Sequence, residues 1–213
     1  MTALRTSRLE LVPLTLSMVE AVLLGRREEA ERLARARMPE RWPNPELVER
    51  AFAMPLERIR AESTSRLWGA RVMIAVPPAG RDPPDQPGAG RDPPDQPGAG
   101  RDPPDKPGAE KSDRRVVGSI VFRGEPDELG IAEIAYGVEE QSQGQGYATE
   151  AVRASVAWAL GHPTGVVKAV QAATFAWHRA SVRVLEKVGM TVIGLRDHET
   201  MGEMVVYERR LMP

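Results

Sequence analysis

Apolar and polar positions recur along the first third of the chain in a way that predicts one strand followed by helices. Residues 8–14 alternate in polarity and end near a proline, which predicts a short strand. Helical recurrence of apolar residues follows, with an interruption at Gly25, and Ser17 with Glu20 has the spacing of a capping box. An Asn-Pro pair at 44–45 is typical of a helix start, so it predicts a second helix.

The remaining pattern predicts a run of strands, then a helix, a strand, a helix and two final strands. Gly189 follows the last helical position and is expected to end that helix. Such an order predicts a mixed α/β fold. The predicted strands are residues 67–76, 115–122, 130–138, 167–174, 191–195 and 201–210. A turn and a helix are predicted over residues 144–160, and a second helix over residues 179–188.

Three nearly identical decamers separate the strands predicted at 67–76 and 115–122. Residues 81–110 read RDPPDQPGAG twice and then RDPPDKPGAE, with three prolines in each decamer and no Val, Ile, Leu, Phe or Trp. Such a segment cannot bury enough apolar area to offset its ordering entropy. We therefore expect residues 77–114 to be a disordered Pro/Gly-rich loop at the tip of a hairpin, within a single domain spanning residues 1–213. A partner-binding role for the repeat is the alternative.

Composition excludes several classes of function. The chain of 213 residues has 29 Lys and Arg against 30 Asp and Glu, so no overall basic charge attracts nucleic acid or an anionic membrane. The absence of cysteine excludes disulfides, thiolate metal ligands and a Cys nucleophile, and three separated histidines predict no metal site. No apolar run reaches the roughly 18–20 residues of a membrane helix, and Glu10 and Glu20 interrupt the N-terminal apolar residues, so we expect no membrane span and no signal peptide. The absence of cysteine is typical of a cytoplasmic protein, so we expect a cytoplasmic location.

A glycine-containing segment joins a predicted strand to a predicted helix, where residues 138–148 read VEEQSQGQGYA. Gly144 and Gly146 allow tight turns and close approach of the backbone to a ligand. Free main-chain N–H groups and the positive end of the helix dipole favour a diphosphate at such a helix start. The segment lacks the Gly-Lys-Ser/Thr of a Walker loop and the third glycine of a dinucleotide fingerprint. A helix start that merely requires glycine is the alternative interpretation.

Three segments together resemble the GNAT N-acetyltransferase superfamily. Residues 141–148, QSQGQGYA, resemble its acetyl-CoA signature, Gln/Arg-x-x-Gly-x-Gly/Ala. Residues 178–190, HRASVRVLEKVGM, resemble its Asn-x-x-Ser…Leu-Glu-Lys-x-Gly-Phe helix. Residues 5–11, RTSRLEL, are similar to the first strand of the Rim-type subgroup, which acetylates protein N-termini and other amines. Order and spacing agree over most of the chain outside the repeat.

The resemblance implies a three-layer fold whose central, mostly antiparallel sheet is splayed between its fourth and fifth strands, here residues 131–138 and 167–174. Acetyl-CoA would lie in that split, with its pyrophosphate on the main-chain N–H groups of residues 143–148 and its pantetheine arm paired with the Val138 backbone. His178 stands where the family has Asn, which changes the shape and charge at that position. The cofactor-binding residues implied are Val138, Gln141, Gln143, Gly144, Gln145, Gly146, Tyr147, Ala148 and His178.

The reaction implied is direct transfer of an acetyl group from the thioester to a primary amine, which must first lose a proton. Glu133 is the candidate base, because burial in an apolar strand would raise its pKa, and a salt-bridged or edge-exposed Glu is the alternative. Ser181 is the candidate partner or proton donor of the sulfur, with tight helix packing as the alternative. Many relatives carry a Tyr acid four residues later, where this chain has Leu185. We expect Glu139 and Glu140 to be solvated.

The acceptor site is predicted near Glu40 and Trp42, which could bind a cationic amine through charge and an aromatic face. The alternative is that Trp42 packs a helix on the sheet. Tyr136, Trp158 and Trp177 are expected in the core. The sequence thus predicts an acetyl-CoA-dependent N-acetyltransferase, monomeric or homodimeric, acting on a protein N-terminus or a small-molecule amine without metal, nucleic acid or membrane. The alternatives are a non-catalytic acyl-CoA sensor or interaction protein using the repeat, and an enzyme that transfers a longer acyl group.

Overall fold

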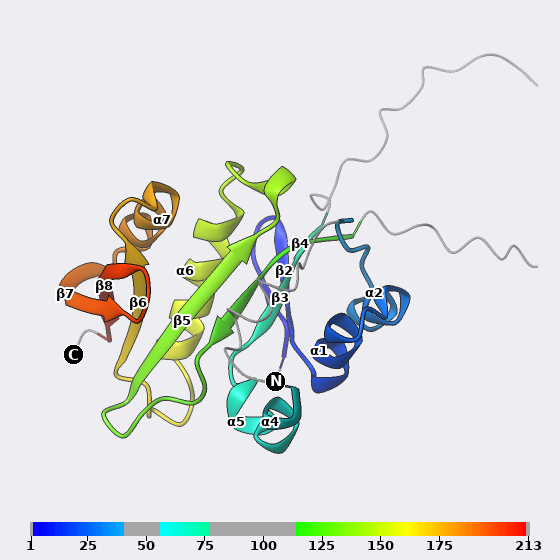
Figure 1. Cartoon of the computed structure of the whole chain (residues 1–213), viewed down its shortest axis with the longest axis horizontal. Coiled ribbons are helices and arrows are strands. Elements are labelled where there is room, and N and C mark those ends of the chain that lie inside the picture. Colours follow the sequence, from blue (N-terminus) through cyan, green and yellow to red (C-terminus); the bar gives the residue numbers. More distant parts are fainter. Residues whose placement is uncertain (1, 41–55, 77–113, 212–213) are drawn as a thin grey trace, which may run out of the picture.

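The described part of the chain folds around one sheet. The structure is a computed structural model that describes residues 2–40, 56–76 and 114–211. Within these ranges eight strands form a sheet of order β1-β2-β3-β4-β5-β6-β8-β7, with helices on both faces (Figure 1). The strands are β1 (Leu4–Arg5), β2 (Leu9–Pro13), β3 (Arg71–Ala75), β4 (Arg115–Phe122), β5 (Ile131–Val138), β6 (Ala169–Phe175), β7 (Thr191–His198) and β8 (Gly202–Arg210). All pairs are antiparallel except β5 with β6.

The helices match the predicted periodicity, with one different start. They are α1 (Leu16–Leu23), α2 (Arg27–Ala34), α4 (Leu56–Ala61), α5 (Ser63–Arg66), α6 (Tyr147–Leu160) and α7 (Arg179–Val188). The expected capping box at Ser17 is wrong, because Thr15 has the extended cap conformation and its hydroxyl accepts the N–H of Met18 at 3.2 Å. The helix expected after residues 44–45 begins outside the described residues. None of the described helices has the length and apolar character needed to cross a membrane.

The two faces of the sheet have separate cores. Alternation along β3 places Val72 and Ile74 in a cluster with α1 and α2, and Met73 in a cluster with α6 and α7. The larger cluster, on the α6 and α7 side, includes the buried residues Ile120, Phe122, Ile134, Val152, Val156 and Leu185. The opposite cluster includes Met18, Ala34, Val72, Ile74 and Val116.

Strands β3 and β4 form the predicted hairpin. They pair antiparallel from Arg71 with Ile120 to Ala75 with Arg115, and the decamer repeat that connects them lies outside the described residues. The first of these strands begins at Arg71 and not at residue 67 as expected. Gly69 adopts a positive φ of 68° in the preceding turn, where a Cβ would lie 2.5 Å from the Phe122 ring, so the chain cannot continue as a strand there.

The sheet is split between β5 and β6, as the resemblance predicted. The two strands pair in parallel only from Ile131–Ala169 to Glu133–Gln171, and β6 then follows β8 along its whole length. The remaining five residues of β5 have no partner on this edge within the described chain, and Figure 1 shows the strands diverging. They are the fifth and sixth strands here because the two-residue β1 precedes the predicted first strand.

Candidate active site

The segment after β5 forms a tight turn that ends at the first residue of α6. A 3-10 turn, η1 (Glu140–Ser142), follows the strand, and Gly144 and Gly146 have φ of 73° and 84°. Gly146 is the N-cap of α6 and carries no side chain that could cap the helix. Both glycines therefore adopt the left-handed conformation that the sequence interpretation required, and the helix start is open to a ligand.

A run of main-chain N–H groups is unpaired at this helix start. Among the hydrogen bonds of the described residues, none has the N–H of any residue from Gly144 to Thr149 as its donor. The predicted run began at Gln143, but the N–H of Gln143 donates to the carbonyl of Glu140 at 3.2 Å. The free donors thus begin one residue later than predicted and extend one residue further.

Side chains of the motif hold the turn in this shape. Gln143 Nε2 donates to the Val138 carbonyl at 3.0 Å, and Gln145 Nε2 donates to the Gln141 carbonyl at 3.1 Å. Both amides are therefore engaged with the loop itself. Their role in the structure is to brace the backbone whose N–H groups remain free.

Glu139 is buried, which contradicts its expected solvation. Its side chain is 5% exposed and its carboxylate accepts the N–H of Gln141 at 2.9 Å and the hydroxyl of Ser142. Arg115 donates to the same hydroxyl at 3.2 Å. The carboxylate caps the 3-10 turn, which supplies the partners that a buried charge needs. Glu140 is exposed as predicted.

The β1–β2 turn contacts the start of α6, and sequence reasoning missed this contact. The Glu150 carboxylate accepts hydrogen bonds from Thr6 Oγ1 at 2.5 Å, Ser7 Oγ at 3.1 Å and the Arg8 main chain at 2.9 Å. Arg8 also pairs with Glu150 at 2.8 Å and donates to the Gln145 carbonyl at 3.0 Å. The only sequence signal for this contact was an acidic residue in the first turn of the helix. That signal does not identify Arg8, which lies 142 residues away in the chain, as the partner.

The free edge of β5 faces the split with main-chain groups. Main-chain hydrogen bonds join the two ends of β5 to β4. At one end the N–H of Arg123 donates to the Glu133 carbonyl, and at the other the N–H of Glu139 donates to the Val117 carbonyl, both at 2.9 Å. Because bonded residues alternate in an antiparallel ladder, the N–H and C=O groups of Tyr136 and Val138 point away from β4. The Val138 carbonyl accepts Gln143 Nε2, and the Val138 N–H and the main-chain groups of Tyr136 are positioned to pair with an extended ligand in the split.

Two hydroxyl groups meet beside this edge. Tyr136 points to the α7 side of β5, and its hydroxyl lies 2.9 Å from Ser181 Oγ and 3.3 Å from the Ser181 carbonyl. Burial raises the pKa of Tyr136 to about 12, although the hydrogen bond to Ser181 opposes this rise. Tyr136 packs against the core as expected, but the sequence did not predict the contact of its hydroxyl.

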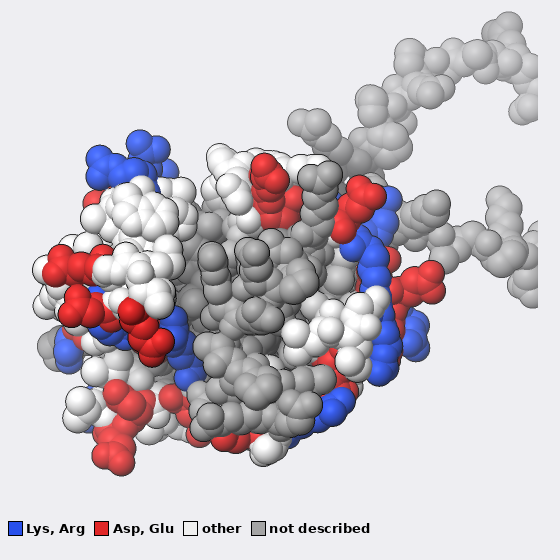
Figure 2. Space-filling view, viewed as in Figure 1, with Lys and Arg blue, Asp and Glu red and all other residues white. Residues whose placement is uncertain are grey.

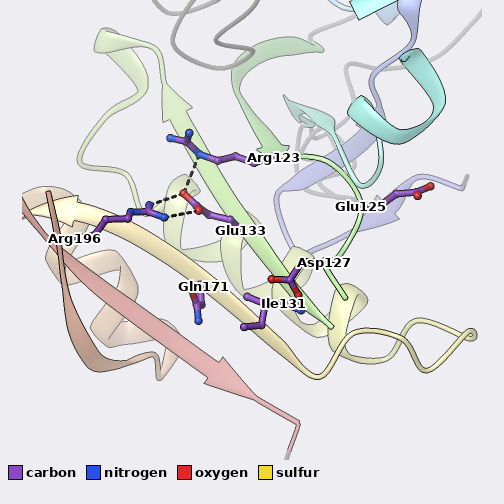
Figure 3. A pocket seen from close by; sticks show the side chains of 7 residues that line it. All are labelled: Arg123, Glu125, Asp127, Ile131, Glu133, Gln171 and Arg196. Atoms are coloured by element: carbon purple, nitrogen blue, oxygen red, sulfur yellow. Dashed lines mark hydrogen bonds and ion pairs between the residues drawn. The ribbon is translucent and has the colours of Figure 1, made fainter. Parts of the chain in front are cut away.

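Glu133 lies on the opposite face in an ion-paired cluster (Figure 3). Arg196 binds both carboxylate oxygens at 2.9 and 2.8 Å, and Arg123 pairs with the same group at 2.9 Å. Burial alone would raise the pKa of Glu133, but the hydrogen bond from Arg196 and the charges of both arginines together lower it. The expected rise in pKa is therefore wrong, and the salt-bridged alternative is confirmed. The cluster borders an open pocket of about 300 Å³.

Comparison with known proteins identifies the fold family. The sequence model of the acetyltransferase (GNAT) domain matches residues 8–191, which is most of the chain. This chain belongs to the GNAT acetyltransferase family. An uncharacterised N-acetyltransferase of Bacillus subtilis, YjdG, is 32% identical over 80 residues, or 38% of this chain and 46% of that protein. The match thus spans just under half the length of this curated relative.

Solved GNAT structures share the fold at low sequence identity. The microcin C7 self-immunity acetyltransferase MccE, solved with acetyl-CoA and AMP, has a TM-score of 0.53 at 13% identity, covering 97% of this chain and 94% of that chain. The ribosomal L7/L12 α-N-protein acetyltransferase RimL, solved with CoA, has a TM-score of 0.54 at 14% identity, covering 99% and 98%. These similarities support the GNAT fold.

The GNAT helix that follows the split differs from the family pattern at its first residue. His178 is the N-cap of α7, without a side-chain cap bond, and its Nδ1 lies 3.5 Å from Thr174 Oγ1.

Trp177 is 65% exposed and its ring stacks on that of Phe175 at 5.1 Å between centroids, so its expected core position is wrong. It lies at the chain reversal between β6 and α7, where none of the described elements covers it. Trp158 packs beside Trp68 in the core, as predicted.

The predicted acceptor residues are only partly described in this GNAT structure. Glu40 is exposed, and its carbonyl accepts Arg27 Nη1 at 3.4 Å, while Trp42 lies outside the described residues. No group of three or more His, Cys, Asp or Glu side chains in the described ranges could hold a metal ion. Figure 2 shows basic side chains at the outer end of α7 and acidic side chains over the β7–β8 hairpin, with uncharged surface between them.

Proposed function

We propose that this GNAT protein transfers an acetyl group from acetyl-CoA to a primary amine of a protein N-terminus or a small molecule. The observation that carries the proposal is the run of unpaired N–H groups from Gly144 to Thr149, at the helix start beside the split sheet. Helix N-termini with free donors are established sites for phosphate groups. The similar fold of MccE, which was solved with acetyl-CoA, supports the choice of ligand.

The cofactor would be held by the backbone more than by side chains. Its pyrophosphate would accept hydrogen bonds from the N–H groups at the start of α6, including those of Tyr147 and Ala148. Its pantetheine arm would pair with the outward main-chain groups of Tyr136 and Val138, as an added strand does. The three glutamines of the motif would hold the loop in the shape that binds the cofactor, because their hydrogen bonds lie within the loop itself. They are Gln141, Gln143 and Gln145.

Ser181 would serve the sulfur side of the reaction. The amine nitrogen attacks the thioester carbonyl, and the departing sulfur needs a hydrogen-bond donor while it carries charge. Ser181 lies in the first turn of α7, beside the free edge of β5 and bonded to Tyr136. Many relatives carry a tyrosine where this chain has Leu185, which is fully buried. Helix α7 therefore supplies no phenol at that position.

Glu133 fits a structural role better than that of a base. A carboxylate whose pKa is lowered by two arginines binds a proton weakly. An α-amino group has an ordinary pKa of about 7.7–8.0, against about 10.4 for lysine, so a fraction of it is neutral without a strong base. The weak basicity of Glu133 therefore favours a protein N-terminus or another amine of low pKa over lysine as the acceptor. RimL, an α-N-protein acetyltransferase, has the same fold.

Calorimetry and thiol release test the proposal. We expect heat from CoA and acetyl-CoA, and free thiol when acetyl-CoA is mixed with peptides that have an unblocked N-terminus. Gly144→Asp should weaken CoA binding at least about 100-fold, because a carboxylate would occupy the site of the diphosphate. Gly165→Asp is the matched control, since Gly165 is also left-handed, lies in open space and follows α6 at its far end. Absence of CoA heat with folded wild type would overturn the proposal.

Binding without thiol release from any amine would instead indicate an acyl-CoA sensor. A panel of N-terminal peptides, lysine peptides and small amines distinguishes these outcomes and ranks the acceptors. The single-domain organisation, the cytoplasmic location and the monomeric or homodimeric state stay predictions.

A further inference from the structure

A hydrogen bond between Tyr136 and Ser181 joins the two halves of the split sheet on its α7 side. Tyr136 lies on β5 three residues beyond Glu133, the last residue that pairs with β6. Ser181 lies on α7, which follows β6 in the chain. The contact of 2.9 Å between their hydroxyl oxygens therefore spans the opening at the level where β5 has a free edge.

The two hydroxyls can form a directed chain of donors. A phenol has one hydrogen to donate, and a serine hydroxyl can accept one hydrogen bond while donating another. When Tyr136 donates to Ser181 Oγ, the hydrogen of Ser181 is available to a third group. Of the three tyrosines in the chain, Tyr136 is the one whose hydroxyl contacts Ser181. Hydrogen bonds linked in this way strengthen one another.

We propose that Tyr136 is a positioning residue for acetyl transfer, which donates to Ser181 Oγ and so directs the Ser181 hydroxyl toward the CoA sulfur as the carbon–sulfur bond breaks. This inference rests on the proposed function. The sequence pattern alone places Tyr136 in the core, because an inward-facing aromatic residue on a strand is ordinarily a core residue.

The protons and electrons balance without ionising either hydroxyl. The amine nitrogen forms a bond to the carbonyl carbon, the C–S bond breaks, and its electron pair stays on sulfur as a thiolate. The proton that the amine loses passes to solvent, and the thiolate takes a proton from solvent. Ser181 and Tyr136 keep their own protons and stabilise the negative sulfur through hydrogen bonds, which are stronger when the acceptor is charged.

The acidity of Tyr136 agrees with a donor that stays neutral. Its pKa of about 12 lies well above the value of about 8.5 for an ordinary thiol, so proton transfer from Tyr136 to the thiolate is unfavourable. Burial keeps the phenol protonated over the whole working range of pH. We therefore expect no ionisation of Tyr136 in the pH–rate profile below about pH 10.

Removal of single hydroxyls tests the inference. Tyr136→Phe keeps the ring and should lower kcat about 10- to 100-fold, while KM and the calorimetric Kd for acetyl-CoA change less than about threefold, because the hydrogen bond stabilises charge that develops only in the transition state. Ser181→Ala should show the same pattern. The double variant should be no slower than the slower single variant, because the two groups act as one chain. Tyr207→Phe, a buried tyrosine of β8 outside the site, is the matched control and should leave kcat unchanged.

Other outcomes separate this inference from the function on which it rests. Full kcat in Tyr136→Phe, or losses that multiply in the double variant, would overturn it while the acetyltransferase function stands. A loss that appears only in Kd would assign Tyr136 to packing and would also overturn it. If Tyr136→Phe did not fold, unchanged kcat in Ser181→Ala would be the contradicting result. Wild type without CoA binding or thiol release would remove the proposed function itself.

Discussion

Glu133 shows how tertiary partners change the chemistry of a single residue. Its place in an apolar strand predicted a raised pKa, because burial disfavours the charged form. The fold brings Arg196 from β7 and Arg123 from the end of β4 to the same carboxylate. Their effect exceeds that of burial, and the net pKa is lowered.

Glu133→Gln should reduce stability at neutral pH without a large loss of rate. A lowered pKa means that the ionised carboxylate stabilises the fold above the unfolded pKa of about 4.5, and that this contribution is lost as pH falls through the folded value. We expect the thermal midpoint at pH 7 to fall by about 2–5 °C and to depend less on pH below the unfolded pKa of about 4.5. Differential scanning fluorimetry across pH measures both effects.

Glu125→Gln is the matched control for this prediction, because Glu125 borders the same pocket but is exposed. It should change neither the midpoint nor its pH dependence. A loss of kcat above about 100-fold in folded Glu133→Gln would contradict the structural role and return Glu133 to the position of a base.

At the scale of elements, the start of α6 is held in place by the β1–β2 turn near the N-terminus. The helix itself follows from its apolar stripe and its glycine N-cap. Its first turn, however, is held by Thr6, Ser7 and Arg8 through the carboxylate of Glu150. The same Arg8 fixes the Gln145 carbonyl, so the β1–β2 turn helps to set the direction of the free N–H groups.

Glu150→Ala should therefore weaken both the fold and the cofactor site. Removal of several hydrogen bonds to one carboxylate predicts a fall in thermal midpoint of about 3–8 °C, and release of Arg8 predicts about 5- to 20-fold weaker CoA binding. Thermal unfolding and calorimetry measure the two effects. Glu140→Ala, an exposed glutamate in the same loop, serves as the control and should change neither. Equal affinities in the two variants would show that the turn does not shape the site.

For the whole molecule, the split sheet creates the site, and the segment that contains the repeat joins two strands that do not border the split. The split lies between β5 and β6, whereas the repeat connects β3 to β4, and all five residues of β3 pair with β4. A hairpin tolerates long connections because the entropy of loop closure grows slowly with length. The repeat is therefore not required for the pairing of these strands.

Deletion of residues 81–110 should leave the molecule folded and able to bind CoA. We expect the thermal midpoint to change by less than about 2 °C and the Kd for CoA to change less than twofold. Calorimetry and thermal unfolding of the shortened chain measure this. A fall in midpoint or affinity well beyond these limits would contradict the passive role of the repeat and support a structural or partner-binding one.

Local patterns were sufficient to predict most elements of the sheet and its helices. Strand β4 and helix α7 lie where alternation, helical spacing and Gly189 placed them, because these signals act within a few residues. The errors concern where elements begin. The chain turns at Gly69, which has a positive φ, so β3 begins later than predicted, and Thr15 caps α1 in place of Ser17.

The sequence by itself determined the family and the glycine turn before α6, because each depends on a local motif, and the resemblance to the family implied the position of the split. Only the tertiary structure decided which side chains meet across the sheet: Glu133 with two arginines, Glu150 with the β1–β2 turn, and Tyr136 with Ser181. The physical reason is that hydrogen bonds and charge interactions act over a few ångströms in space. Separation along the chain, which is all that a sequence displays, does not determine that distance.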